Sequence, residues 1–327
     1  MYPNNKALLV GIDEYKTAPL SCCCNDVDAM DQLLSWQENS NRDRNFFVQK
    51  HKNVKTKGEL LGLIQECFGD KQDVALFYYS GHGYIDSFGG YLVPSEYSPN
   101  DWGVSLQDVL TAANNSPSTD KIVILDSCFS GAMGAVPAIN QNTAFINEGV
   151  TILTSCSKDQ PALAGAKNSV FTSLLLEALN GGAADVLGHI TVGGIYAFID
   201  KSLTPWDQRP IFKTNVSRFT SLRDVTPQVP LQIIKEAMTY FADPSKPLKL
   251  DPSFEKTNDP DVKHEYKKPY AYPENVAKLK NLQKLVSIGL VVPDGAEHMY
   301  FAAMDGKACK LTAVGQHYWK LVKDGKI

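Results

Sequence analysis

Two short motifs, each directly after an apolar stretch, decide the fold of this chain: YYSGHG at residues 78–83 and DSCFSG at residues 126–131. The apolar stretches at residues 74–78 and 122–125 predict two buried strands that end at these motifs. Parallel neighbouring strands would bring both motifs to one edge of a sheet, where open α/β folds hold their sites. The first motif supplies the imidazole of His82 and the second the thiol of Cys128, which suit a nucleophile and its proton carrier.

The first two thirds of the chain alternate predicted strands with predicted helices. We expect strands at residues 6–12, 46–49, 74–79, 121–126, 149–155 and 210–213, helices at 26–37, 56–68, 105–114, 169–179 and 191–203, and a small hairpin at 83–94. Thr56 is placed to cap the second helix. This alternation predicts an α/β fold with a mostly parallel sheet covered by helices on both faces.

The composition is that of an ordinary soluble globular protein. Of the 327 residues 43% are hydrophobic, and the formal net charge of −4 gives no reason to expect binding to nucleic acid or acidic membranes. No apolar stretch reaches the ~18 residues of a membrane span, and the N-terminus reads as a first strand, not a secretory leader. The seven cysteines show no disulfide or zinc spacing, so we expect reduced thiols and a cytoplasmic protein.

The character of the sequence changes after about Thr226. Residues 227–273 read as a linker or partly ordered segment, because much of this stretch is rich in Pro, Asp and Lys and weakly periodic. Residues 274–327 predict a helix, then a hairpin that pairs residues 290–292 with 299–302, then a closing helix at 311–322. This order resembles a winged-helix module. We therefore expect a peptidase-sized domain at 1–226 and a small α+β domain at 274–327.

The role of residues 274–327 is open between four alternatives: binding a partner protein, binding nucleic acid, covering the active cleft, or packing as a stabilising appendage. We favour binding to a regulatory protein. The segment is only weakly basic, and the chain has no Arg after Arg223, although Arg is the residue that most often reads bases. Nucleic-acid binding is therefore not expected.

The two motifs carry the requirements of thiol catalysis. A thiol attacks a carbonyl only as thiolate, and an adjacent imidazole can take its proton and later protonate the leaving amine. Cys128 and His82 fit these roles. The backbone N–H groups of Gly83 and Cys128 are candidates for the oxyanion hole, because glycine allows close approach of the backbone to substrate.

LFYYSGHG and VILDSCFSG resemble the His and Cys motifs of the caspase-like clan, and of metacaspases in particular. ALLVGIDEY, LSCCCNDVDAM, FTSLLLEAL and QRP at residues 208–210 resemble further parts of that family, so the resemblance covers about residues 5–215. It implies the three-layer caspase–hemoglobinase fold, with a six-stranded sheet whose last strand is antiparallel. It also implies peptide-bond hydrolysis through a thioester, by a Cys-His dyad.

The same resemblance implies an acidic substrate pocket. Metacaspases carry an acid two residues before the nucleophile and an Asp in the first loop, which match Asp126 and Asp26 here, and Cys23 and Ser80 would line the same pocket. Two carboxylates in a partly dry pocket favour a cation, and Arg binds them in bidentate fashion. We therefore predict cleavage after Arg, with Lys weaker. The alternative for Asp26 is that it caps the following helix.

Two departures from the family pattern bear on activation. Many metacaspases need calcium, but the acids after the His motif (Asp86, Glu96, Asp101 and Asp108) are scattered, so we expect no cofactor and activity in chelator. Residues 129–150 contain no Lys or Arg, so an Arg/Lys-specific enzyme cannot cut itself there. Lys158, Lys167 and the Lys-rich stretch 246–268 remain open to such cleavage.

Two other functions stay open at this stage. The chain is compatible with a catalytically silent caspase-like scaffold, although the intact His82 and Cys128 argue against it. It is also compatible with a DNA-binding regulator whose caspase-like part is a sensor, which the weak positive charge of the tail does not favour. Of the remaining cysteines, the triplet at 22–24 is expected to pack before a helix, apart from the pocket role of Cys23.

Overall fold

The chain forms two compact units, Met1–Thr226 and Pro227–Ile327. The computed structural model describes residues 4–38, 43–98, 101–127, 146–155, 167–203, 210–258 and 266–327, and the backbone of 129–130. No helix within these ranges is both long and apolar enough to cross a bilayer.

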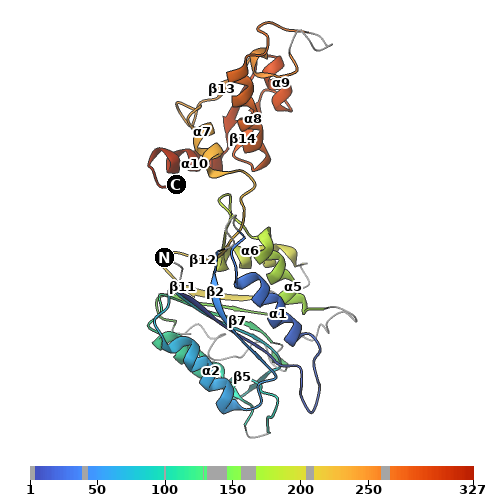
Figure 1. The fold of residues 1–327 in the computed structure, drawn as a ribbon, viewed down its shortest axis with the longest axis vertical. Coiled ribbons are helices and arrows are strands. Elements are labelled where there is room, and N and C mark those ends of the chain that lie inside the picture. The colour runs from blue at the N-terminus through green and yellow to red at the C-terminus, as the bar shows by residue number, and fades with distance from the viewer. Residues whose placement is uncertain are drawn as a thin grey trace. The chain divides into compact units, whose positions relative to one another are not determined.

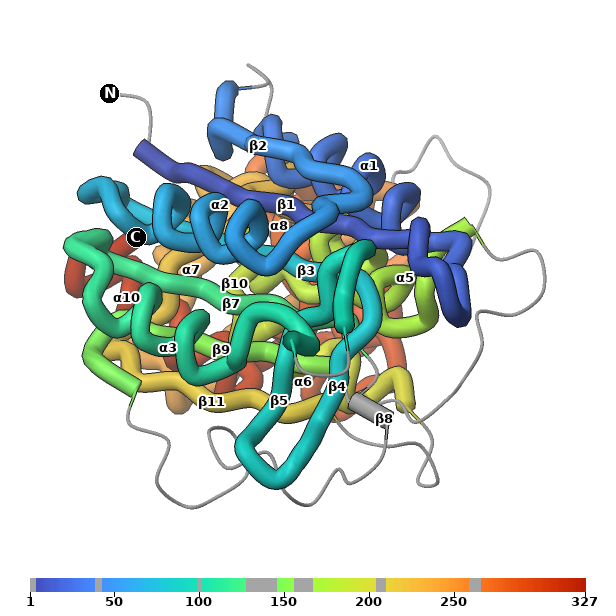
Figure 2. The backbone as a smooth tube through the Cα atoms, turned by 90° about the horizontal axis from the view of Figure 1, so that it is seen from below, coloured from blue at the N-terminus to red at the C-terminus, as the bar shows by residue number. Residues whose placement is uncertain are grey.

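A six-stranded sheet forms the centre of the first unit (Figures 1 and 2). Its strands are β1 (Asn5–Gly11), β2 (Phe46–Lys52), β3 (Val74–Ser80), β7 (Asp120–Asp126), β9 (Val150–Thr154) and β11 (Ile211–Asn215). Their order is β11-β9-β7-β3-β1-β2, and all neighbours are parallel except β11, which runs antiparallel to β9. The predicted mostly parallel sheet with one antiparallel edge strand is confirmed.

Helices cover both faces of this sheet (Figure 1). One face packs on α1 (Cys23–Leu34), α5 (Val170–Glu177), which continues into the turn η1 (Ala178–Gly182), and α6 (Val192–Ser202), and the other packs on α2 (Lys57–Gly69) and α3 (Leu106–Asn115). All seven residues of β3 are buried, and their side chains alternate between the two cores. Such strands are apolar on both faces because helices cover both, as expected for a three-layer α/β fold.

Polar residues set where these helices begin. Thr56 accepts a hydrogen bond from the Glu59 N–H at the start of α2, as predicted. Ser105, Ser169 and Thr191 cap α3, α5 and α6 in the same way. Each cap satisfies a backbone N–H that lacks a partner within its helix, which typically contributes about 1 kcal/mol.

Short strands follow the two motifs. The predicted hairpin is present as β4 (Gly83–Asp86) and β5 (Gly89–Leu92), and a four-stranded sheet joins them to β6 (Val104–Ser105) and β8 (Phe129–Ser130). Strand β8 runs parallel to β4, with Phe129 opposite Gly83. A further pair, β10 (His189–Thr191) and β12 (Ser221–Asp224), lies outside the central sheet.

The second unit is more ordered than its sequence predicts. It contains α7 (Leu231–Met238), β13 (Leu248–Lys249), η2 (Pro252–Phe254), α8 (Pro273–Ser287), β14 (Val291–Asp294), α9 (Met299–Met304), β15 (Ala308–Leu311) and α10 (Ala313–Lys323). Its three-stranded antiparallel sheet has the order β13-β15-β14. The predicted helices at 274 and 311 are present, whereas the predicted strand at 299–302 is wrong, because those residues form α9 and β14 pairs with β15 instead.

The linker predicted at 227–273 is also wrong for its described part. Residues 227–258 belong to the second compact unit. Asn258 explains how a polar segment becomes ordered: it is fully buried, and its side-chain amide donates to the carbonyl oxygens of Pro252, Lys267 and Pro269. Order here comes from side-chain bonds to the backbone, which hydrophobic periodicity does not reveal. The winged-helix assignment stays a prediction.

Candidate active site

His82 lies just beyond the end of β3 in a backbone that two tyrosines hold. The Tyr15 hydroxyl accepts a hydrogen bond from the His82 N–H at 3.0 Å, and the Tyr79 hydroxyl donates to the His82 carbonyl at 2.9 Å. Gly81 precedes the histidine because a Cβ there would lie 2.7 Å from both hydroxyl oxygens. The first glycine of the SGHG motif is therefore required by packing, and it fixes where the imidazole leaves the backbone.

The imidazole itself is oriented by a backbone carbonyl. Nε2 of His82 lies 2.7 Å from the carbonyl oxygen of Ala18. A carbonyl can only accept, so Nε2 carries the hydrogen in this contact, and Nδ1 is left as the acceptor of the neutral ring. Ala18 holds its carbonyl there with a φ of 58°, in the left-handed region that non-glycine residues rarely adopt.

The loop that carries Ala18 is fixed at its start by Asp13. The Asp13 carboxylate accepts the backbone N–H groups of Cys23 and Cys24 at 2.9 and 3.1 Å, in the first turn of α1. The side-chain oxygen of Asn53 in turn accepts the N–H of Asp13 at 2.9 Å. Through Asp13 the start of the loop is thereby tied both to the first turn of α1 and to the residue after β2.

Cys128, the predicted nucleophile, lies outside the described residues, whereas the chain on either side of it is described. The Gly81 N–H donates to the Asp126 carbonyl at 3.2 Å, and Phe129 pairs with Gly83 across the two strands β8 and β4. The backbone before and after position 128 therefore runs beside the backbone before and after position 82. The predicted oxyanion role of the Gly83 and Cys128 N–H groups stays a prediction.

Asp26 is a fully buried carboxylate on α1. Its Oδ2 accepts the Ser80 hydroxyl at 2.9 Å, and its Oδ1 accepts the Asn168 side-chain amide at 2.9 Å and the Ser169 N–H at 3.1 Å. The alternative that Asp26 caps its helix is wrong, because α1 begins at Cys23, and Asp13 accepts its first-turn N–H groups instead.

Asp126 ends β7 and shares these surroundings. Its Oδ2 accepts the Thr172 hydroxyl at 2.6 Å and a short bond from the Ser169 hydroxyl. Ser80 and Asp126 are register partners of the adjacent strands β3 and β7. Ser169 therefore touches both carboxylates, through its N–H to Asp26 and its hydroxyl to Asp126.

The two acids lie close enough to perturb each other. Burial and, to a smaller extent, the negative charge of Asp126 together raise the pKa of Asp26 to about 6, against the lowering effect of its hydrogen bonds. Burial also raises the pKa of Asp126. Within the described residues neither carboxylate has a cationic partner. Such a pair gains from binding a cation.

Cys23 and Ser80, the other predicted pocket residues, are also buried here. Burial raises the pKa of the Cys23 thiol, with smaller contributions from nearby Asp13, Asp26 and Asp126, and its bond to Ser80 lowers it. The thiol is therefore protonated at neutral pH. The structure thus brings Asp26, Asp126, Ser80 and Cys23 into one cluster, whereas their role in binding substrate stays a prediction.

Sequence reasoning missed the residues that orient this cluster and the imidazole. Asn168, Ser169 and Thr172 read only as the beginning of a helix, and Ala18 acts through its backbone, which leaves no signal in sequence. Tyr15 stands in the quoted GIDEY stretch, but nothing in the pattern predicts its contact with His82.

Three of the four acids considered for calcium have hydrogen-bond or ion-pair partners in the described structure. Asp86 accepts the N–H groups of Phe88 and Gly89 in the hairpin turn, Asp101 pairs with Lys57, and Asp108 accepts the Ser105 hydroxyl. No group of three or more His, Cys, Asp or Glu side chains in the described ranges is arranged to hold a metal ion. Calcium independence stays a prediction. Most of the 129–150 segment considered for self-cleavage, and Lys158, lie outside the described residues.

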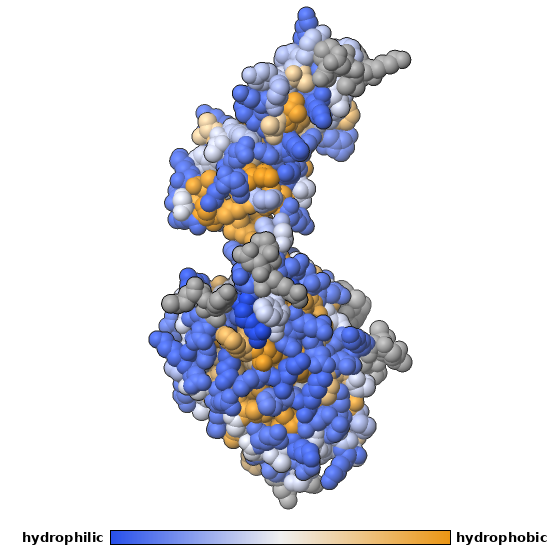
Figure 3. Space-filling view, viewed as in Figure 1, coloured by the Kyte–Doolittle hydropathy of each residue, from blue (hydrophilic) through white to orange (hydrophobic). Residues whose placement is uncertain are grey.

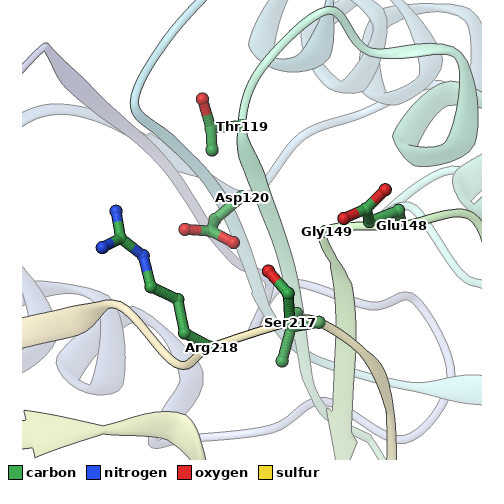
Figure 4. A pocket seen from close by; sticks show the side chains of 7 residues that line it. Thr119, Asp120, Glu148, Gly149, Ser217 and Arg218 are labelled. Atoms are coloured by element: carbon green, nitrogen blue, oxygen red, sulfur yellow. The ribbon is translucent and has the colours of Figure 1, made fainter.

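A separate pocket of about 260 Å³ lies at the other end of the sheet (Figure 4). It is lined where β7 and β9 begin and β11 ends, with Asp120, Glu148 and Arg218 among its residues. His82 and Asp126 follow or end parallel strands, whereas this pocket lies where those strands begin. It is therefore not part of the predicted peptidase site.

Comparison with known proteins agrees with this geometry. The model of the caspase domain family matches residues 4–218. Solved structures similar to this chain include a crystal structure of caspase-1 from Spodoptera frugiperda, at 14% identity and a TM-score of 0.50, covering 69% of this chain and 93% of that one. A structure of pro-Sf-caspase-1 matches at 13% identity and a TM-score of 0.49, covering 68% of this chain and 95% of that one.

No curated protein gives a significant match. At these identities the structural likeness establishes the fold, and the family match, which spans well over half of the chain, establishes the kind of domain. The predicted resemblance to caspase-like cysteine peptidases is thus confirmed. With its caspase-type sheet and a match from residue 4 to residue 218, the chain belongs to the caspase domain family of cysteine peptidases.

Proposed function

We propose that the first unit is a metacaspase-type endopeptidase of the cytoplasm that cleaves after Arg, and more weakly after Lys. In this mechanism Nδ1 of His82 takes the proton of the Cys128 thiol, and the thiolate attacks the carbonyl carbon of the peptide bond. The N–H groups of Gly83 and Cys128 stabilise the oxyanion. His82 then gives its proton to the leaving amine, and water hydrolyses the thioester, returning the sulfur to its thiol form.

The hydrogen bond from Nε2 of His82 to the Ala18 carbonyl supports the role of the imidazole. It holds the ring in the tautomer whose free acceptor is Nδ1, the atom that would take the thiol proton. It also stabilises the imidazolium, which has two N–H groups and needs an acceptor for each. The carbonyl performs the orienting task that a carboxylate performs in other hydrolases.

The observation that carries the Arg preference is the buried pair Asp26 and Asp126. Two carboxylates without a cation among the described residues are costly to keep ionised, which is why their pKa values are raised. A substrate guanidinium would replace hydroxyl and amide donors on these oxygens with charge-assisted bonds, which are about twice as strong. A lysine ammonium supplies the charge without the planar fork, so it would bind more weakly.

A panel of peptides that differ only in the residue before the cut tests this proposal. We expect turnover with Arg, less with Lys, and none with Asp or norleucine. Asp26→Asn and Asp126→Asn should each lose most of the Arg turnover, and Cys128→Ala all of it. Preference for Asp, or equal cleavage of Arg and norleucine peptides, would contradict the proposed specificity.

We also propose that this activity needs no calcium and no cut within residues 129–150. The ordinary hydrogen-bond and ion-pair roles of Asp86, Asp101 and Asp108 support the first point, and the lack of Lys and Arg supports the second. Turnover should be the same in EDTA and in millimolar calcium. Purified active protein should have an intact 129–150 segment by mass spectrometry.

The second unit is proposed to bind a regulatory protein. Apolar side chains gather on the face of this unit that Figure 3 shows. Its exposed large apolar residues include Tyr266, Tyr270, Tyr272, Phe301 and Val314. Exposed aromatic residues are enriched where proteins bind proteins, which supports a protein partner over nucleic acid.

A further inference from the structure

Two buried tyrosines hold His82 through its backbone and its ring. Tyr15 accepts the His82 N–H, and its ring lies against the imidazole with ring centroids 4.5 Å apart and an interplanar angle of 55°. Tyr79 holds the His82 carbonyl. The exposed fractions of Tyr15 and Tyr79 are 5% and 0%. The imidazole is therefore packed against a side chain that solvent hardly reaches.

The hydroxyl groups of Tyr15 and Tyr79 both have hydrogen-bond partners in this region. Tyr15 accepts from the His82 N–H and lies 3.1 Å from the Val93 carbonyl, to which it donates its single hydrogen. Tyr79 lies 2.9 Å from the carbonyl oxygens of both His82 and Val93, and the two hydroxyl oxygens are 3.4 Å apart. Because Val93 follows β5, the tyrosine pair ties the histidine to the neighbouring hairpin.

Burial keeps these hydroxyls in the form that the contacts need. It raises the pKa of Tyr15 and of Tyr79, so that both remain neutral and keep their hydrogen at any physiological pH. The charged or ionisable groups that raise the pKa of Tyr15 further are Cys23 and Asp13. Burial keeps Cys23 a neutral thiol, so of these two groups only Asp13 carries a charge that acts on the Tyr15 hydroxyl.

We propose that Tyr15 is a positioning residue for the catalytic histidine. Its hydroxyl fixes the backbone from which the imidazole leaves, and its ring fixes the plane of the imidazole against the Ala18 carbonyl, so that Nδ1 keeps one direction. The role rests on the proposed function of His82 as the base. The positioning role goes beyond the proposed function, because Tyr15 would affect the rate without touching the substrate, only through its contacts with His82.

The expected effect is on turnover and not on substrate binding. Misplacing a catalytic group by about 1 Å costs on the order of 10²-fold in rate. Tyr15→Phe removes only the hydroxyl and should lower kcat about tenfold, the value of one hydrogen bond of about 1.4 kcal/mol. Tyr15→Leu also removes the ring and should lower kcat about 100-fold. KM for an Arg peptide should stay within about twofold in both, since the acid pair is untouched.

Tyr196→Phe is the matched control. Tyr196 is partly buried in the other core, on α6, where its ring stacks on Phe212 at 4.9 Å. Losing that hydroxyl should leave kcat and KM as in the wild type. Tyr79→Phe provides a second comparison: it removes a bond to the His82 carbonyl without touching the ring contact, so its loss in kcat should be smaller than that of Tyr15→Leu.

A second readout does not depend on turnover. In the Cys128→Ala background, ¹⁵N NMR of the His82 ring should show the Nε2–H tautomer in the parent and a mixture of tautomers in Tyr15→Leu. If the wild type cleaves no peptide, the proposed peptidase function fails while this measurement still decides the positioning role. An unchanged kcat in Tyr15→Phe together with one unchanged tautomer in Tyr15→Leu would overturn the inference.

Discussion

Asp26 is a carboxylate that the fold buries at a cost. Its pKa is raised to about 6 by burial and by Asp126, so the folded chain holds this proton more tightly than the unfolded chain, where an Asp titrates near 3.9. Stability therefore falls as the pH rises from about 4 to about 6, and the cost of ionisation is fully present above that window. A buried carboxylate with a raised pKa is a candidate for a functional site, which agrees with the proposed binding of a cation here.

Replacing this carboxylate with its neutral isostere should stabilise the protein. The Asn in Asp26→Asn can still accept from Asn168 and Ser169 through its oxygen, and can donate to the Ser80 oxygen. At pH 7.5 we expect a gain of roughly 3 kcal/mol in the free energy of unfolding, from the rise in the pKa of Asp26 to about 6. Thermal unfolding at pH 7.5 and pH 4.5 measures it, and the gain should fall to about a third at the lower pH, where the folded carboxyl group is protonated and the unfolded one is still partly ionised.

Asp101→Asn is the control for that experiment, because Asp101 is exposed and pairs with Lys57 at the surface. Its effect should be within about 0.5 kcal/mol at either pH. If Asp26→Asn destabilises the chain at pH 7.5, the carboxylate serves to stabilise the fold, which would contradict the proposed role in binding substrate.

The same ionisation predicts how substrate binding depends on pH. Above a pH of about 6 Asp26 is charged and attracts a guanidinium, and below it the group is protonated and the attraction weakens. KM for Arg peptides should therefore rise as the pH falls from 7.5 through 6 toward 5. Initial-rate kinetics across this range separate KM from kcat. A KM that stays constant over the whole range would show that this carboxylate does not bind the cation.

Part of the site was predictable at the scale of single residues. His82 and Asp126 stand in polar motifs where two apolar stretches end. Because those stretches predict parallel strands, both residues are expected at the same edge of the sheet. The donors on the acids could not be predicted, because Asn168 and Ser169 come from a segment more than 140 positions after Asp26 along the chain. A contact of that kind depends on tertiary packing, so the local pattern of apolar and polar residues does not predict it.

At the scale of elements, the first turn of α5 serves two purposes. Ser169 caps the helix by accepting the Thr172 N–H at 3.0 Å, and it also donates to the two acids. Asn25 strengthens the arrangement by donating its amide to the Lys167 carbonyl at 3.2 Å. The beginning of α5 is therefore bound to α1 and β7 at the point where the acids meet.

Ser169→Ala separates these two purposes from each other. Loss of the cap should cost about 1 kcal/mol, and loss of the hydroxyl donor should raise the pKa of Asp126, shifting the rise in KM toward higher pH. Thr56→Ala is the matched control, since Thr56 caps α2 in the same way but touches no carboxylate of the pair. It should lose similar stability, with the pH dependence of KM unchanged. Equal pH profiles in the two variants would contradict the proposed link.

A close approach between two elements gives a further prediction. A Cβ at Gly11, the last residue of β1, would lie 2.3 Å from the Cys23 carbonyl oxygen at the start of α1. Gly11→Ala should therefore push α1 from the sheet and destabilise the chain by about 2 kcal/mol. Gly58, in the first turn of α2, has open space around it, so Gly58→Ala should stabilise by about 0.5 kcal/mol. Chemical denaturation measures both changes.

Elements were predictable where one physical signal dominates. The strands β3 and β7 are apolar on both sides because helices cover both, and α2 begins at a residue that caps it. The prediction failed at residues 299–302, where an apolar run too short to show a helical period forms α9. It failed again near Asn258, where polar bonds to the backbone provide the order that hydrophobic burial provides elsewhere.

At the scale of the whole molecule, the apolar cores lie in two separate parts of the sequence. The first unit has an apolar core on each face of its sheet, and the second has its own, which includes Leu279, Leu282, Leu285, Leu290 and Cys309. The change in composition near Thr226 falls where the two compact units meet in sequence. Composition reveals the boundary between two domains because the apolar residues of each core come from that domain's own part of the chain.

Cutting the chain after Thr226 should give two fragments that each fold. The first keeps all six strands of the central sheet and the acid pair, so it should unfold cooperatively, and its kcat on short Arg peptides should stay within about threefold of that of the full chain. The second fragment is small, but its sheet closes locally and its buried leucines follow one face of α8, so it should also show a cooperative transition. Circular dichroism melts of each fragment and of the full chain measure this.

The kinetic result of the same cut decides what the second unit does. If that unit recruits a regulatory protein, short peptides should be cleaved equally well without it, and only the response to cell extract or to the isolated partner should be lost. A rise in kcat/KM of tenfold or more would instead make the second unit an inhibitor of the first. Loss of cooperative unfolding in the first fragment would make it a structural support, and would contradict the division of the molecule into two independently folding parts.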